Sequence, residues 1–284
     1  MRGSGKLSSM ASSNPAFNNS PAFSERASTA AKLTTTTPST EGMTAQQLTE
    51  LYSLPSATPA QTDRMSYEDT IVKIASTFAI LLVGAAVGWF VPVLTLPAAL
   101  VGFGLALVNI FKKKPSPALV IAYSAVEGIF VGGITMFFES NFPGIAVQAV
   151  MGTLIVVGVT LALFVSGKIR ASKKATKVFL IAMIGYAVFS LINMVLIMTG
   201  ANSDPFGVSG SVIVPILGVP LGVILGPLVI IMAAYSLVLD FDSIKTGVQR
   251  GAPRVYGWTA AFGIMVTVVW LYLEILRLLA LLRR

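Results

Sequence analysis

Beyond residue 70 the chain is a succession of long apolar runs interrupted by short polar stretches. A helix of about 20 mainly apolar residues is long enough to cross the hydrocarbon core of a bilayer. Seven segments meet this description, at residues 70–91, 97–111, 117–138, 145–166, 177–199, 213–241 and 255–282. The second is short and the last two are long. The pattern predicts an all-α, polytopic membrane protein with seven transmembrane helices, forming one domain over residues 66–284.

The first 65 residues do not follow this pattern. The stretch MRGSGKLSS before Met10 resembles a cloning remnant, and residues 10–42 are rich in Ser, Thr, Ala, Asn and Pro. Because this segment has few large apolar residues to bury, burial cannot offset the loss of chain entropy on folding. We therefore expect a disordered cytoplasmic tail over residues 1–65. Within it, TAQQLTELYSLP predicts one short helix at 44–54, either a transient surface helix or a docking element. Ser66, followed by Asp69, is a capping signal for the first apolar run.

Basic residues are confined to alternate loops. Three loops contain eleven Lys and Arg: KKKP (112–115), KIRASKKATK (168–177) and IKTGVQRGAPR (244–254). The other three contain none: VPVLTLP (91–97), ESNFPG (139–144) and GANSDPFG (200–207). Since positively charged loops stay in the cytoplasm, we expect a cytoplasmic N-terminus in the cytoplasmic (plasma) membrane. Arg283 and Arg284 then either reach the outer headgroups or show that the last helix does not cross completely.

Composition narrows the chemistry. The chain is 55% apolar and 11% charged, with a mean hydropathy of +0.81 and a formal net charge of +8. Because the basic residues lie in loops and at helix ends, topology explains that charge and no nucleic-acid partner is expected. The absence of cysteine and histidine excludes Cys and His metal sites, a Ser-His-Asp triad and a Cys-His nucleophile. Any pH response near neutrality must therefore come from carboxylates.

Small and polar residues recur on three predicted helices. Two stripes at steps of four residues predict close helix packing: Ser124, Gly128, Gly132 and Gly218, Gly222, Gly226. The prolines of the sixth segment favour kinks: Pro215, Pro220 and Pro227. A third set places polar groups on one face of segment 177–199, as interhelical hydrogen bonds or as the lining of a pathway: Tyr186, Ser190 and Asn193.

Four acidic residues lie within the predicted helices, where a charge is costly unless it is paired, hydrated or neutralised: Glu127, Asp240, Asp242 and Glu274. Glu127 is near the bilayer centre, with no Lys or Arg within helical reach. Asp242 either forms an ion pair with Lys245, three residues later, or faces a pathway. Glu274 likewise either forms an ion pair with Arg277, three residues later, or faces a pathway. Asp240 lies about 7 Å deeper than Lys245.

Two motifs carry a family resemblance. LDFDSIK (239–245) resembles the Tyr-Asp-x-Asn-x-Ile pattern that ends the sixth helix of the Bax inhibitor family, and LYLEILRLL (271–279) resembles its Leu-Tyr-Leu-Asp segment in the last helix. Over residues 66–284 the chain is thus similar to transmembrane Bax inhibitor motif proteins and their bacterial YccA-like relatives. The resemblance implies seven helices with a central last helix, and a calcium leak gated by two acidic residues that sense pH.

The position-by-position match assigns the two acidic roles to Asp240 and Glu274, which would also be possible Ca²⁺ ligands. Leu239 replaces the tyrosine of the pattern, Asp242 its asparagine and Glu274 its second aspartate. Asp240 and Glu274 are separated by 34 positions, 274 minus 240, which is more than in the family pattern. If the additional residues lengthen the loop, the pair survives; if they lengthen the last helix, Glu274 misses Asp240.

The expected function is a pH-sensitive leak channel for Ca²⁺ or other cations in a bacterial inner membrane, with Asp240, Glu274, Asp242 and Glu127 as pH sensor and cation pathway. Protonation would close the acidic pair, and ionisation would present hard oxygen ligands to the cation. Lipid and permeant Ca²⁺ are the expected partners, with no bound cofactor and no enzymatic activity. The alternative is a membrane-embedded regulator of a membrane-bound protease, with the tail as a handle.

Overall fold

The computed structural model of the 284-residue chain describes residues 44–46 and 63–284. The helix predicted at 44–54 and the tail around it therefore lie outside the described residues, except for 44–46. From residue 67 onward the elements are α4 (Tyr67–Phe90), η1 (Pro92–Leu94), α5 (Thr95–Phe111), α6 (Pro117–Asn141), α7 (Ile145–Val165), α8 (Lys173–Met198), α9 (Val208–Ser211), β1 (Ile213–Val214), β2 (Val219–Pro220), α10 (Leu221–Gln249), η2 (Arg254–Tyr256) and α11 (Gly257–Leu282).

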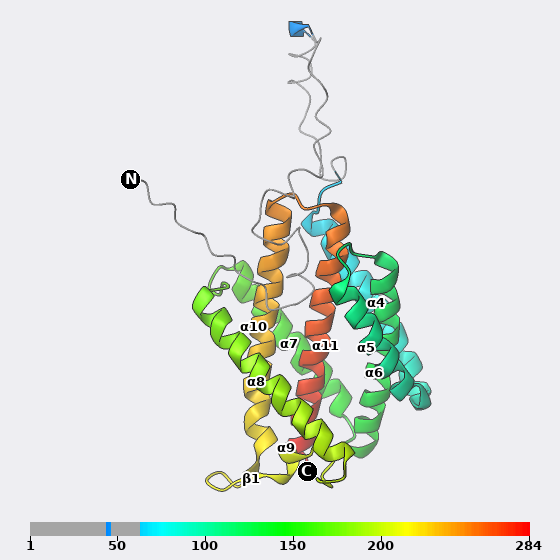
Figure 1. Ribbon diagram of the computed structural model, residues 1–284, viewed down its shortest axis with the longest axis vertical. Coiled ribbons are helices and arrows are strands. Elements are labelled where there is room, and N and C mark those ends of the chain that lie inside the picture. The colour runs from blue at the N-terminus through cyan, green and yellow to red at the C-terminus, as the bar shows by residue number, and fades with distance from the viewer. Residues whose placement is uncertain (1–43, 47–62) are drawn as a thin grey trace.

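Seven described helical segments are long and apolar enough to cross a membrane, which confirms the predicted all-α polytopic membrane fold. They stand side by side in one bundle (Figure 1). The capping signal before the first is also confirmed, since the hydroxyl of Ser66 accepts a hydrogen bond from the Asp69 amide at 3.2 Å. The loops at 112–116, 166–172 and 250–256 mark what we call the basic end of the bundle, and the opposite end is the far end.

The sixth helix differs from its predicted bounds of 213–241. The chain first forms β1 and β2, an antiparallel hairpin in which Ile213 pairs with Pro220, and α10 begins only at Leu221. Gly218 lies in the hairpin turn with φ of 65°, a left-handed conformation that other residues disfavour. Gly218 is therefore not part of a helical stripe. At the other end α10 continues to Gln249, so that Asp240 and Asp242 both lie within the helix.

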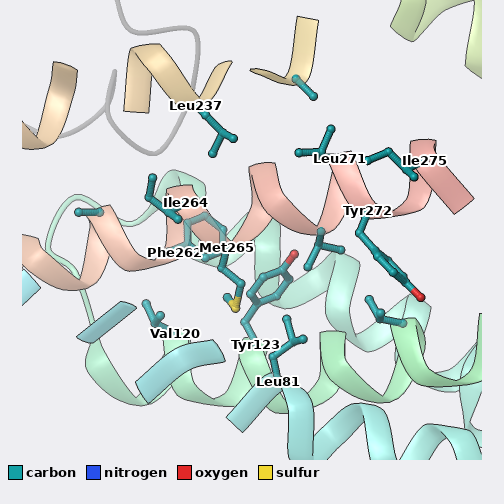
Figure 2. Close-up of a cluster of buried hydrophobic side chains, with 14 of the residues drawn as sticks. Leu81, Val120, Tyr123, Leu237, Phe262, Ile264, Met265, Leu271, Tyr272 and Ile275 are labelled. Carbon is teal, nitrogen blue, oxygen red and sulfur yellow. The ribbon is translucent and has the colours of Figure 1, made fainter. Parts of the chain in front are cut away.

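The last helix is at the centre of the bundle, as the family resemblance implied. In α11, 61% of the apolar stretch is buried, against none of that of α8. Figure 2 shows the core around it: Phe262 and Tyr272 of α11 lie toward Tyr123 and Leu81, and Leu237 of α10 lies on the other side. Tyr123 and Phe262 meet edge to face, with ring centroids 5.1 Å apart.

Glycines hold α4 and α6 close together. A Cβ added to Gly132 would collide with the backbone of Ala85, and one added to Gly84 would collide with the backbone at Ala125. Gly128 meets α4 in the same way. The stripe that ends at Gly132 is thus a packing surface that lets two backbones approach, as its spacing predicted.

The C-terminal arginines bind loops at the far end. Arg283 donates hydrogen bonds to the carbonyl of Pro143 at 2.9 Å and to Gln148 at 2.7 Å. Arg284 forms an ion pair with Asp204 at 2.5 Å. The last helix therefore runs the full length of the bundle, and its arginines pair with protein groups at the end opposite the basic loops.

Candidate functional site

Asp240 lies at the contact between α10 and α11. Its side chain is fully buried, at 0% exposure, and its Oδ2 accepts a hydrogen bond from Thr267 Oγ1 at 2.6 Å. Nine residues of α10 separate Asp240 from the last residue of the helix at the basic end, about 13 Å at 1.5 Å per residue. The carboxyl group is thus placed deep within the bundle, where a charge is costly unless its surroundings stabilise it.

The two helices that meet here, α10 and α11, run antiparallel along most of their length (Figure 1). Toward the far end, Gly222 of α10 faces Leu281 of α11, and Gly226 faces Leu278. Farther toward the basic end, Asp240 of α10 contacts Thr267 of α11. The contact between Asp240 and Thr267 therefore depends on the position of α11 along α10, as do the two glycine contacts.

Glu274 lies on α11 seven residues beyond Thr267, about 10 Å farther along the helix. Its Oε1 accepts a hydrogen bond from the hydroxyl of Tyr186 on α8. Its Oε2 pairs with Arg277 Nη2 at 2.7 Å, which is the local ion pair that the sequence left open for it. The Arg277 guanidinium also lies over the ring of Tyr186, 5.9 Å from the centroid.

The acidic pair expected from the resemblance is accordingly not formed between these two described residues. Asp240 binds Thr267, whereas Glu274 binds Tyr186 and Arg277. Because α10 extends to Gln249 and α11 begins at Gly257, most of the positions between the two acids lie in the helices and few in the loop. The two carboxylates are thus held by different hydrogen-bond partners, at Thr267 and at Tyr186 with Arg277.

Asp242 forms no ion pair within the described part of the chain. The charges of Lys245 and Arg170 act on it from beyond ion-pair distance, and its side chain is partly exposed. The close pair with Lys245 that three-residue spacing allows is thus not made. Asp242 lies on the basic-end side of Asp240 and does not share its hydrogen bond with Thr267.

Glu127 belongs to α6, and its side chain faces α5. It interacts with the Tyr123 hydroxyl one helical turn earlier, and a Cβ added to Gly102 would stand 3.2 Å from its Oε2. The carboxylate therefore fills space left by a glycine of the neighbouring helix. Within residues 44–46 and 63–284, no three His, Cys, Asp or Glu side chains come together as a metal site.

Comparison with known proteins decides the family. The chain matches the family described as Bax inhibitor 1 like over residues 14–284, which is most of its length. The chain belongs to this family. The match begins well before residue 66, where the resemblance of the two motifs began. No curated protein matches the chain.

The structure gives two residues of this Bax inhibitor 1-like chain partners that the sequence does not reveal. In the sequence, Thr267 is a small polar residue within an apolar helix and nothing distinguishes it. In the structure its hydroxyl donates a hydrogen bond to Asp240. Tyr186 belongs to the polar face of segment 177–199, and it makes an interhelical hydrogen bond to Glu274 while that face also lines a cavity. Asn193 of the same face bonds the carbonyl of Phe206 at 3.1 Å and the amide of Val208 at 2.6 Å.

A further polar cluster closes the basic end of the bundle. Lys73 donates to Asp69 and to the carbonyl of Arg254 at 2.7 Å, and Arg254 Nε donates to Asp69 at 2.8 Å. The amide of Met65 bonds the carbonyl of Ala252 at 2.7 Å. This cluster joins the start of α4 to the loop between α10 and α11. The i, i+4 spacing of Asp69 and Lys73 is the only part of it that the sequence displays.

Proposed function

We propose that the protein is a pH-sensitive leak for Ca²⁺ or other cations in the cytoplasmic membrane, with Asp240 as the acid that controls it. The observation that supports this is the fully buried Asp240 carboxyl group at the contact between α10 and α11. A chain without histidine has only carboxylates to titrate near neutrality. Among the four intramembrane acids, Asp240 is the one whose side chain is completely buried, at the contact between two long helices.

The control follows from the cost of burying a charge. When Asp240 is protonated, it is neutral and hydrogen-bonded to Thr267, and the helices remain packed. Ionisation places a charge in this fully buried contact, which favours entry of water or a cation and separation of α10 and α11 at this level. Pro227 lies near the start of α10 and lacks the amide N–H of a regular helical turn, so bending there lets the longer part of α10, which carries Asp240, move.

A carboxylate exposed in this way is a hard oxygen ligand, which suits Ca²⁺ as the permeant ion. The gate proposed here uses one acid and one threonine in place of an acidic pair. Flux should therefore fall as the pH drops, because protonation restores the neutral Asp240–Thr267 contact. Glu274, engaged with Arg277 and Tyr186, has no direct part in this step.

The test is Ca²⁺ entry into liposomes that contain the purified protein and a trapped calcium indicator, measured from about pH 6 to pH 8. Asp240→Asn removes the titrating group but keeps its shape, and should flatten the pH response. Asp242→Asn, on the same helix, is the matched control and should keep it.

An Asp240→Asn protein with the wild-type pH response would refute the assignment of Asp240. Absence of flux from every variant, wild type included, would refute the leak and favour the regulator of a membrane protease. That alternative predicts capture of a membrane protease by the full chain, and loss of capture when residues 10–65 are removed.

A further inference from the structure

A cavity of about 450 Å³ lies between α8 and α11, on the side of the bundle where α8 crosses in front of α10 and α11 in Figure 1. This volume is in the range of sites for small organic molecules. Its wall combines a carboxylate, Glu274, with two aromatic side chains, Tyr186 and Trp270. Met194 and Met198 of α8 supply an apolar and strongly exposed part of the wall.

The helix that forms one wall is held to the bundle mainly near its ends. At the basic end, Thr176 and Tyr235 share a hydrogen bond of 3.0 Å. At the far end, Asn193 bonds the loop at Phe206. Between these anchors Phe179, which packs against Tyr235 near the basic end, is the one buried residue among those described for α8. The cavity is therefore flanked by a helix face that borders lipid, which is a route for an amphiphilic molecule.

The side chain of Arg277 already places a cation at the wall of this cavity. The Arg277 guanidinium pairs with Glu274 at 2.7 Å and lies over the Tyr186 ring, 5.9 Å from its centroid. A delocalised organic cation is thus held by a carboxylate and an aromatic face, the two groups that recognise such cations in general. The internal guanidinium shows which chemistry the cavity favours.

We propose that this cavity binds a lipophilic organic cation, with its charge on Glu274, its flank against Tyr186 and Trp270, and its apolar body along the methionines of α8. Met side chains suit this role because they adapt to irregular apolar shapes. Arg277 is the internal competitor. It lies five residues before the end of α11, about 7 Å, so its long side chain can turn toward the membrane surface and vacate the carboxylate. The site goes beyond the proposed leak and does not depend on it.

Equilibrium dialysis of the purified full-length protein with tetraphenylphosphonium tests the site. The wild type should bind the cation saturably, and uncharged triphenylphosphine oxide should not compete. Glu274→Gln should weaken binding about tenfold or more, because the desolvated cation loses its counter-charge. Arg277→Gln should strengthen binding, because it removes the competitor. A purely structural ion pair would give no such opposite effects.

Two further variants keep the test independent of folding. Ser190→Trp fills the cavity while leaving Glu274 and Arg277 in place, and should abolish binding with little change in thermal stability. Asp242→Asn removes a carboxylate near the basic end and should leave binding unchanged. Binding that survives Glu274→Gln, weakens in Arg277→Gln or persists in Ser190→Trp would overturn the proposal.

Discussion

Asp240 on α10 and Glu274 on α11 are both carboxylates within the bundle, but their surroundings are opposite. Asp240 is fully buried between two tightly packed helices and bonds a neutral hydroxyl. Glu274 borders a cavity, has a cation three residues away and is tied to the loosely packed α8. The first arrangement makes ionisation costly, whereas the second balances a charge that is already there. Two acidic residues thus have different surroundings, which is why we propose a gating role for Asp240 and a binding role for Glu274.

Removal of the Thr267 hydroxyl should have the largest effect on stability. Thr267→Val keeps the shape of the side chain but takes away the donor to a completely buried carboxyl group, which should cost about 1–3 kcal/mol. A thermal unfolding scan in detergent measures the loss. Thr267→Ser retains the hydroxyl and is the control. Equal stability of the valine and serine variants would show that this hydrogen bond contributes nothing.

Glu274→Gln separates the two sites. The amide still accepts from Tyr186, but the ion pair with Arg277 is lost, so stability should fall by only about 1 kcal/mol. The pH response of Ca²⁺ flux should remain that of the wild type, in contrast to Asp240→Asn. The liposome assay decides, and a flattened response in Glu274→Gln would mean that both carboxylates act in one gate after all.

Asp242→Asn should have the smallest effect. The side chain is partly exposed and makes no ion pair within the described residues, so a change within about 0.5 kcal/mol is expected. The same thermal scan measures it beside the two variants above. A loss as large as that of Thr267→Val would place Asp242 in the buried contact with Asp240.

The orientation of the bundle in the membrane can be measured by labelling introduced cysteines. The eleven Lys and Arg of the basic loops predict that cysteines introduced at Ser140 and Ser203 react with an impermeant reagent outside intact cells. A cysteine at Ser172 should not react until the cells are opened. Labelling at position 172 in sealed cells would invert the orientation and move Asp240 to the outer half of the membrane.

Much of the fold could be predicted from the sequence because each membrane helix satisfies its own backbone hydrogen bonds and needs only a sufficient apolar length. The seven segments, the capping role of Ser66 and the packing at Gly132 all follow from local spacing. The start of the sixth helix does not, since the hairpin around Gly218 is as apolar as the helix after it. Hydropathy alone cannot distinguish the two.

Partners across the bundle were decided by the tertiary structure. The sequence determined that Asp240 and Glu274 lie inside helices, but their partners depend on how far α11 slides along α10, and a shift of two turns exchanges one neighbour for another about 10 Å away. Only the packed bundle brings Thr267 to Asp240 and Tyr186 to Glu274. The register is set by side-chain packing along the whole contact, including Gly222 and Gly226, and no short motif contains that information.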